Sequence, residues 1–144
     1  MLNGSRVKVV KPLLASAGAV GAILVLGAAQ RPASLAPTSG GLWEVSGAPG
    51  SKAPAKMCVA DPAFLAQFEH RGRQCTRVVV SDSAPTTVIR YTCVAGGFGE
   101  SRMTLITPRS IRIETQGISE DLPFNYVVQA RRVGECPALA AKPH

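Results

Sequence analysis

The residues of this sequence best suited to covalent chemistry are four cysteines, Cys58, Cys75, Cys93 and Cys136. Cysteines can form disulfides, ligate zinc, or exchange electrons through a Cys-x-x-Cys motif. Their spacings of 17, 18 and 43 residues contain no such motif, and the only histidines are His70 and His144. Because zinc sites usually take their ligands in closely spaced pairs, the sequence predicts disulfides and no metal site.

The two middle cysteines flank a predicted β-hairpin. Two strand-like runs, 76–80 and 86–94, stand on either side of the turn-rich sequence at 81–85. In a hairpin centred on position 84, directly opposed residues have numbers that sum to 168, so Cys75 faces Cys93. Opposed residues have Cβ atoms about 4.5–5.5 Å apart, which is close enough for a bridge after modest adjustment. We therefore predict a Cys75–Cys93 disulfide.

The two outer cysteines then pair by elimination, out of the three connectivities that four cysteines allow. A Cys58–Cys136 bridge would tie the region before the predicted helix to the C-terminal end of the chain. Closing a long loop of this kind stabilises a fold by about 2–4 kcal/mol.

The remaining ionisable residues do not form a catalytic pattern. His70 is the one plausible general base, and no Gly-x-Ser-x-Gly sequence accompanies it. His70 ends the predicted helix, where an imidazolium interacts favourably with the helix dipole, and this structural role is the preferred interpretation. The adjacent carboxylates Glu120 and Asp121 fall in a predicted turn. We expect a protein without catalytic residues or cofactor; a hydrolytic enzyme with an unrecognised site is the alternative.

Three arginines form the main candidate ligand-binding set, Arg90, Arg112 and Arg131. Strand periodicity places them on the solvent face of neighbouring strands, and arginine suits bidentate contact with phosphate or carboxylate. Anionic lipid headgroups are therefore one expected partner. The competing interpretation is an ordinary charged sheet face that protects the protein against edge-to-edge association. The few aromatic residues are directed to the core, so no nucleic-acid partner is expected.

Two further binding hypotheses depend on the shape of a curved sheet. An apolar pocket between sheet and helix would be lined by aromatic residues, Phe64, Phe68, Tyr91, Phe124 and Tyr126. A filled core is the alternative for these residues. The strand that carries Trp43, or the strand at 122–133, could instead be an edge offered to an envelope protein for strand addition.

The elements that position these residues are one helix and about six strands. Asp61 caps the helix, Pro62 fits its first position, and Phe64, Leu65 and Phe68 share one face. The predicted strands are 41–46, 75–81, 86–94, 101–107, 110–115 and 122–133. Short turn-rich links join the last five. The expected fold is α+β: a curved antiparallel β-meander with one short helix and two disulfides.

Alternation along the strands predicts which side chains form the core. The inward-facing set is Val79, Ile89, Tyr91, Cys93, Leu105, Ile111, Ile113, Phe124, Tyr126, Val128 and Ala130, with the helix residues named above. Trp43 and Val45 share a face of the first strand, and Trp43 is expected to anchor the core or its rim.

The first 29 residues resemble a secretory signal peptide. Arg6, Lys8 and Lys11 precede 13–29, a run of 17 residues of which 13 are Ala, Val, Ile or Leu. Small residues at its end predict cleavage between Ala29 and Gln30, which lowers the formal charge from +7 to +4. An uncleaved membrane anchor is the alternative; otherwise the membrane is met only transiently, through the signal peptide. The predicted organisation continues with a flexible segment at 30–40 that buries little, a single domain at 41–136 and a frayed tail at 137–144.

The ordered set of motifs resembles one bacterial family. A Gly-Leu-Trp-Glu-Val sequence opens the domain at 41–45, Met57-Cys58 precedes the helix, two cysteines follow 18 residues apart, and Arg-Val-Gly-Glu-Cys closes at 132–136. This set resembles the secreted family described as domain of unknown function 3617. The resemblance implies a small exported, periplasmic protein of a Gram-negative bacterium, and it implies no activity and no functional residues. The sequence thus predicts an exported, non-enzymatic binding or interaction module of the cell envelope, with carriage of a small apolar or anionic lipid-like ligand as an alternative.

Overall fold

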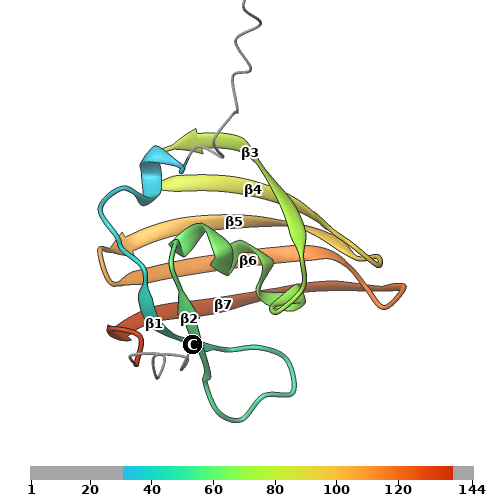
Figure 1. Cartoon of the computed structure of the whole chain (residues 1–144). Coiled ribbons are helices and arrows are strands. Elements are labelled where there is room, and N and C mark those ends of the chain that lie inside the picture. The colour runs from blue at the N-terminus through green and yellow to red at the C-terminus, as the bar shows by residue number, and fades with distance from the viewer. Residues whose placement is uncertain (1–30, 138–144) are drawn as a thin grey trace, which may run out of the picture.

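Seven antiparallel strands make one continuous sheet in residues 31–137, the part of the chain that the computed structural model describes (Figure 1). The strands are β1 (Gly41–Ser46), β2 (Ala55–Val59), β3 (Cys75–Ser83), β4 (Thr86–Cys93), β5 (Phe98–Thr107), β6 (Ser110–Ser119) and β7 (Leu122–Gly134). Their order across the sheet is β2-β1-β7-β6-β5-β4-β3. The predicted meander is confirmed as β3 to β7, and β1 returns to pair with β7. The predicted signal peptide lies outside the described residues.

The fold is richer in strand than predicted, with seven strands in place of six. The additional strand, β2, pairs with β1 over Gly41↔Val59 to Val45↔Ala55 and forms one edge of the sheet. Its five residues follow a loop rich in Gly and Pro, and their alternation of apolar and polar residues is too short to predict a strand. Neither β1 nor β7 is therefore an outer strand of the sheet, contrary to the strand-addition hypothesis as first framed; the outer strands are β2 and β3.

The predicted helix is confirmed as η2 (Pro62–His70), although it is a 3-10 helix with a kink at Gln67. The Asp61 carboxylate accepts a hydrogen bond of 3.0 Å from the Ala63 amide, as an N-cap does. The predicted apolar face is partly wrong. Because a 3-10 helix has three residues per turn, Leu65 and Phe68 align and are buried, whereas Phe64 is 42% exposed. In residues 31–137 no helix is long and apolar enough to cross a membrane.

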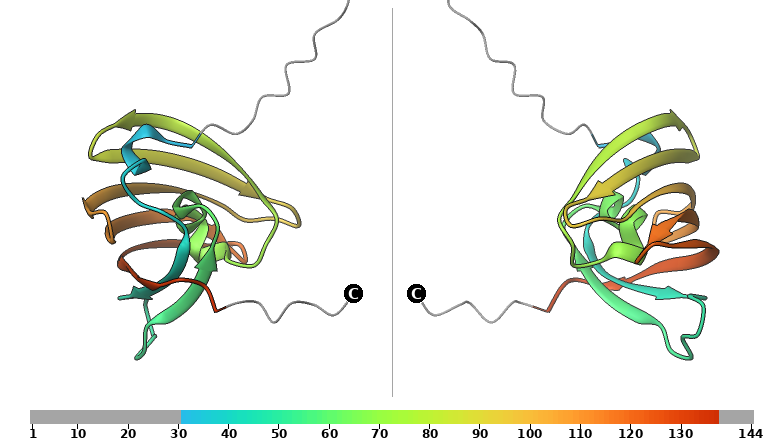
Figure 2. Two further views of the ribbon diagram at one scale, coloured as in Figure 1. Left: turned by 60° about the vertical axis from the view of Figure 1, so that its left-hand side comes forward. Right: turned by 90° about the vertical axis from the view of Figure 1, so that its right-hand side faces the viewer.

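The sheet curls around η2, so that its inner face and the helix enclose the core (Figure 2). Trp43 is fully buried, as expected of a core anchor. The predicted inward-facing residues of β4 and β6 are also buried, among them Ile89, Ile111 and Ile113. Val79 was predicted to be in the core and is 40% exposed, because it lies on the outer strand β3, where little covers the inner face.

Both predicted disulfides are confirmed. Cys75 lies directly opposite Cys93 in the β3–β4 ladder, with 3.9 Å between their Cα atoms. The ladder closes through a two-residue turn at 84–85, and a β-bulge between Val79 and Ser81 restores the predicted register at the cysteines. Cys58 of β2 is bonded to Cys136, with 5.5 Å between Cα atoms.

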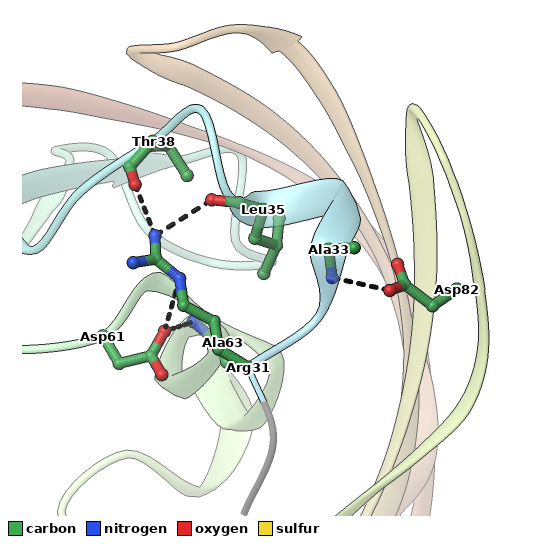
Figure 3. A network of polar contacts seen from close by, with 7 residues as sticks. All are labelled: Arg31, Ala33, Leu35, Thr38, Asp61, Ala63 and Asp82. Carbon is green, nitrogen blue, oxygen red and sulfur yellow. Dashed lines mark hydrogen bonds and ion pairs between the residues drawn. The ribbon is translucent and has the colours of Figure 1, made fainter.

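The segment before β1 is part of the fold, which corrects the prediction of a flexible stretch that buries little. It contains the short 3-10 helix η1 (Ala33–Leu35), and Leu35 is fully buried in the core. The Arg31 guanidinium donates hydrogen bonds to the carbonyls of Leu35 and Thr38 and lies 3.7 Å from the Asp61 carboxylate (Figure 3).

The Asp82 carboxylate of β3 holds the other side of η1, because it accepts a hydrogen bond of 2.6 Å from the Ala33 amide (Figure 3). It accepts two more from the amide and the hydroxyl of Ser34. Hydrogen bonds from Ser34 lower the pKa of this carboxyl. The domain therefore includes residues 31–40, which precede the predicted boundary at 41.

Candidate functional site

An open hollow of about 570 Å³ lies on the outer face of the sheet, away from η2, where β5 and β7 begin and β6 ends. Its lining is mostly apolar and comes from Phe98 and Gly99 of β5, Gly117 and Ile118 of β6, and Pro123 and Phe124 of β7. The polar lining residues are Arg90, Glu100, Gln116 and Asn125. We call this feature the outer hollow. Its volume falls within the range of roughly 300–1,000 Å³ that is usual for small-molecule sites.

An ion pair forms the charged rim of the outer hollow. The Arg90 guanidinium donates two hydrogen bonds to Glu100 Oε2, of 3.2 Å from Nε and 2.7 Å from Nη2. The two residues are opposed in the β4–β5 ladder, which fixes the pair on the outer face. Phe98, which is 51% exposed, lies two residues from Glu100 on the same strand and face. An apolar surface and a charged pair thus meet at one place.

Two opposed glycines fix the inner side of this region. Gly99 and Gly117 are partners in the β5–β6 ladder, between Tyr91 of β4 and Phe124 of β7. A Cβ on Gly99 would lie 2.5 Å from the Tyr91 hydroxyl, and a Cβ on Gly117 would lie 2.1 Å from the Phe98 carbonyl oxygen. Only glycine therefore lets the aromatic rings lie across the strands here, and the apolar residues Phe98 and Ile118 are left on the outer side.

The three arginines predicted to bind a ligand all lie on the outer face, but the structure does not bring them together. Arg90 lines the outer hollow. Arg112 is opposed to Gln129, two residues from Arg131, so these two are diagonal neighbours on β6 and β7. Arg90 is aligned through Glu100 with position 116 of β6, four residues or roughly 13 Å along that strand from Arg112.

Acidic residues on neighbouring positions bind two of these arginines. Arg90 pairs with Glu100, and Arg112 lies 2.9 Å from the Glu114 carboxylate. No ion pair involves Arg131 within residues 31–137. A ligand contact by these arginines stays a prediction, and the geometry restricts a joint site to Arg112 and Arg131.

A second concavity of about 600 Å³, the inner groove, lies on the other side of β7. Its walls are the loop after β1 and the first half of β7, and its floor is the end of η2 with Phe68, Glu69 and Arg71. Of the five aromatic residues predicted to line a concave pocket, Phe68, Phe124 and Tyr126 line this groove. Tyr91 is buried in the core. Phe64 lies outside the groove, and the Arg77 guanidinium lies over its ring, 3.7 Å from the ring centre.

The polar groups of the inner groove are partly satisfied. The Tyr126 hydroxyl donates a hydrogen bond of 2.7 Å to the Glu69 carboxylate. Burial and this hydrogen bond raise the pKa of Tyr126, so the phenol keeps its proton. Arg71 lies over the Phe68 ring, 4.6 Å from its centre, and donates to the Phe68 carbonyl.

His70 packs against the rings of Tyr91 and Phe124 and is not the charged helix cap that the sequence predicts. Its side chain is 1% exposed, and Nδ1 lies 3.1 Å from the Tyr91 hydroxyl. Burial, reinforced by the charge of Arg73, lowers the pKa of His70, against the opposing influence of Glu69 and the Ile118 carbonyl. The imidazole is therefore a neutral core group, and the candidate base of the sequence is inaccessible.

Sequence reasoning named Phe124 but missed the other apolar residues of the outer hollow. Phe98 and Gly117 fall outside the predicted strands 101–107 and 110–115, although β5 begins at Phe98 and β6 extends to Ser119. A sequence signal for this hollow is a large apolar residue directly beside a glycine, which occurs at Phe98-Gly99 and Gly117-Ile118.

Comparison with known proteins gives no match, whether against family models, curated proteins or solved structures. The resemblance to domain of unknown function 3617 therefore stays a prediction. Within residues 31–137 there is also no cluster of three His, Cys, Asp or Glu side chains that could hold a metal ion.

Proposed function

We propose that this protein is an exported, non-enzymatic binding module of the bacterial cell envelope, and that it takes the apolar part of a small lipid-like ligand into the outer hollow. The observation that carries the proposal is the apolar surface of Phe98, Ile118 and Pro123 at an open hollow of about 570 Å³. Placing an apolar chain against these residues removes exposed apolar area from water, which is favourable by about 25 cal/mol per Å². The two disulfides and the predicted signal peptide support an exported location.

The charged rim suggests the head group. Arg90 can turn from Glu100 toward an anionic head group, because both side chains are on the surface. A carboxylate or phosphate would then compete with Glu100 for the guanidinium. An acidic lipid-like molecule is therefore the preferred ligand, ahead of a neutral one of the same chain length.

Isothermal titration with laurate and with the neutral ester monolaurin tests the proposal. We expect Phe98→Ser to weaken the binding of both ligands at least fivefold, because the apolar contact is shared. Ile106→Ser is the matched control, since Ile106 is 58% exposed on the same strand but outside the hollow, and it should change neither affinity.

Two charge variants separate the head group from the chain. Arg90→Gln should weaken laurate alone, and Glu100→Gln should strengthen laurate alone, because it frees Arg90. The double variant Arg112→Gln with Arg131→Gln lies outside the hollow and should have no effect. Equal losses in Arg90→Gln and in this double variant would assign binding to the arginine-bearing face, and no laurate binding at all would contradict the proposal.

A further inference from the structure

The first half of β7 has no strand beside it on one side. β1 pairs with β7 from Leu42↔Gly134 to Ser46↔Gln129, and the chain then leaves the sheet at Gly47. β7 begins seven residues earlier, at Leu122, and pairs there only with β6 in the described part of the chain. Although β7 is an interior strand over its second half, residues 122–128 are an internal free edge of the sheet.

The register identifies which backbone groups face this free edge. The Arg132 amide donates to the Arg109 carbonyl, on the β6 side, with an N···O distance of 2.9 Å. In an antiparallel strand the backbone groups of successive residues point to alternate neighbours, and the β6–β7 register is continuous. Even-numbered residues of β7 therefore bond to β6, and Asn125 and Val127 direct their N–H and C=O groups toward the free edge.

The inner groove lies alongside these backbone groups, because Pro123, Phe124, Asn125 and Tyr126 of β7 form one of its walls. The opposite wall is the loop that carries Ala48, Pro49 and Ser51. An added strand would therefore find both backbone partners at its edge and space for its inward-facing side chains. The groove of about 600 Å³ supplies that space.

Arg71 offers an acidic side chain one cationic partner in the inner groove, beside the carboxylate of Glu69. Glu69 already accepts the hydroxyl of Tyr126. Arg71 has no ion-pair partner within residues 31–137, and its one hydrogen bond goes to the Phe68 carbonyl. A guanidinium held against an aromatic ring on the floor of a groove is a good partner for a carboxylate.

The outer strands of the sheet are less suited to strand addition. β3 carries the bulge between Val79 and Ser81, and its Asp82 side chain is bonded to η1, two features that protect an edge. β2 has only five residues and is tied by its disulfide to Cys136. β2 reaches the inner groove only at Ala55, and β3 lines a smaller concavity of about 250 Å³.

We propose that an acidic, extended segment of a partner protein adds as a strand to residues 122–128 of β7. The added segment lies in the position that β1 would occupy if it extended beyond Gly47. It bonds to the backbone of Asn125 and Val127, and it directs one carboxylate side chain toward Arg71. Main-chain bonds give such a complex its affinity and the groove gives it selectivity. This site is on the inner side of β7 and does not depend on ligand binding in the outer hollow.

The test is selection of displayed random heptapeptides on the oxidised, mature chain, followed by amide hydrogen exchange of the complex with the best synthetic peptide. We expect the selected peptides to be enriched in Asp or Glu and in β-branched residues. In the free protein the Asn125 and Val127 amides should exchange at least tenfold faster than those of Phe124 and Tyr126. Bound peptide should slow the Asn125 and Val127 amides by at least tenfold.

Three variants identify the contacts. Asn125→Pro removes only an amide that faces the free edge, so the protein should fold and lose peptide binding at least tenfold. Arg71→Gln should weaken binding at least tenfold, with less dependence on salt. Arg131→Gln, an exposed arginine on the outer side of the same strand, should bind as the wild type does.

Several outcomes would overturn the proposal. These are selection of no peptide, protection of the β2 or β3 amides in place of Asn125 and Val127, and equal exchange of all four β7 amides in the free protein. Protection that grows with the concentration of the protein alone would assign the free edge to a second copy of the chain.

Discussion

His70 combines burial with an unsatisfied polar atom, which makes it the residue whose protonation matters most to the fold. Nδ1 is bonded to the Tyr91 hydroxyl, whereas Nε2 is buried without a hydrogen-bond partner among the described residues. A Cβ on Gly97 would lie 2.3 Å from Nε2, so the turn packs directly against the ring. A proton on this imidazole would thus bring into the core a charge that Glu69 and the Ile118 carbonyl offset only in part.

The stability of the protein should fall as the pH is lowered from 6.5. The folded-state pKa of His70 is below its ordinary value of 6.5, chiefly because of burial. Above pH 6.5 the imidazole is neutral in both states. Below it the unfolded chain takes up a proton first, so the free energy of unfolding falls by up to about 1.4 kcal/mol per pH unit until the folded-state pKa is reached. Urea unfolding between pH 7.5 and 5 measures this slope.

Two substitutions isolate the contribution of His70 to that slope. His70→Phe removes the titrating group, so its slope should be smaller than that of the wild type. Tyr91→Phe removes the same hydrogen bond but keeps the imidazole, so its slope should persist. Each should lower stability at pH 7.5 by about 1–3 kcal/mol, through a lost partner or a changed core. Equal slopes in the wild type and His70→Phe would show that His70 is not the group responsible.

At the level of elements, η1 should stabilise the domain as much as a core strand does. Leu35 is fully buried, and Arg31 and Asp82 hold the segment from both sides (Figure 3). Leu35→Ala should lower the free energy of unfolding by about 2–5 kcal/mol, as buried leucine truncations do. Leu122→Ala is the control, because Leu122 is 68% exposed and its truncation should cost less than about 0.5 kcal/mol. Similar urea midpoints for the two variants would mean that η1 does not contribute to the core.

The sequence was informative about elements that depend on local pattern and uninformative about those that depend on distant partners. The β3–β4 hairpin was predictable because its turn and its alternation are local. β2 and η1 were not, since β2 exists through its pairing with β1, and Leu35 is an isolated apolar residue among Pro, Ala and Ser. Val79 was misassigned because alternation gives the face of a residue but not whether another element covers it.

The same limit applies to the candidate site. The outward direction of Arg90, Arg112 and Arg131 followed from alternation, but their separation depends on the register of four strands. The ion pairs of Arg90 and Arg112 likewise join residues whose proximity only that register reveals. The free edge of β7 is a difference in length between β1 and β7, and no local pattern encodes it.

At the scale of the whole molecule, the two disulfides constrain the sheet very differently. The Cys75–Cys93 bridge joins strands that are already neighbours, at a sequence separation of 18 residues. The Cys58–Cys136 bridge spans 78 residues and links the edge strand β2 to the chain just after β7, across the end of β1. Loss of the second bridge therefore frees the edge strand β2 and the chain after β7 at once.

Removing the long-range bridge should accordingly cost more stability than removing the hairpin bridge. Loop-closure entropy gives about 4.5 kcal/mol for Cys58→Ser with Cys136→Ser and about 3 kcal/mol for Cys75→Ser with Cys93→Ser. Urea unfolding followed by the fluorescence of the buried Trp43 measures both. A non-reducing mass spectrum of the wild type, four hydrogens lighter than the reduced chain, is the control that both bridges have formed. A hairpin bridge that proves the more costly to lose would mean that chain entropy does not govern how these cross-links stabilise the sheet.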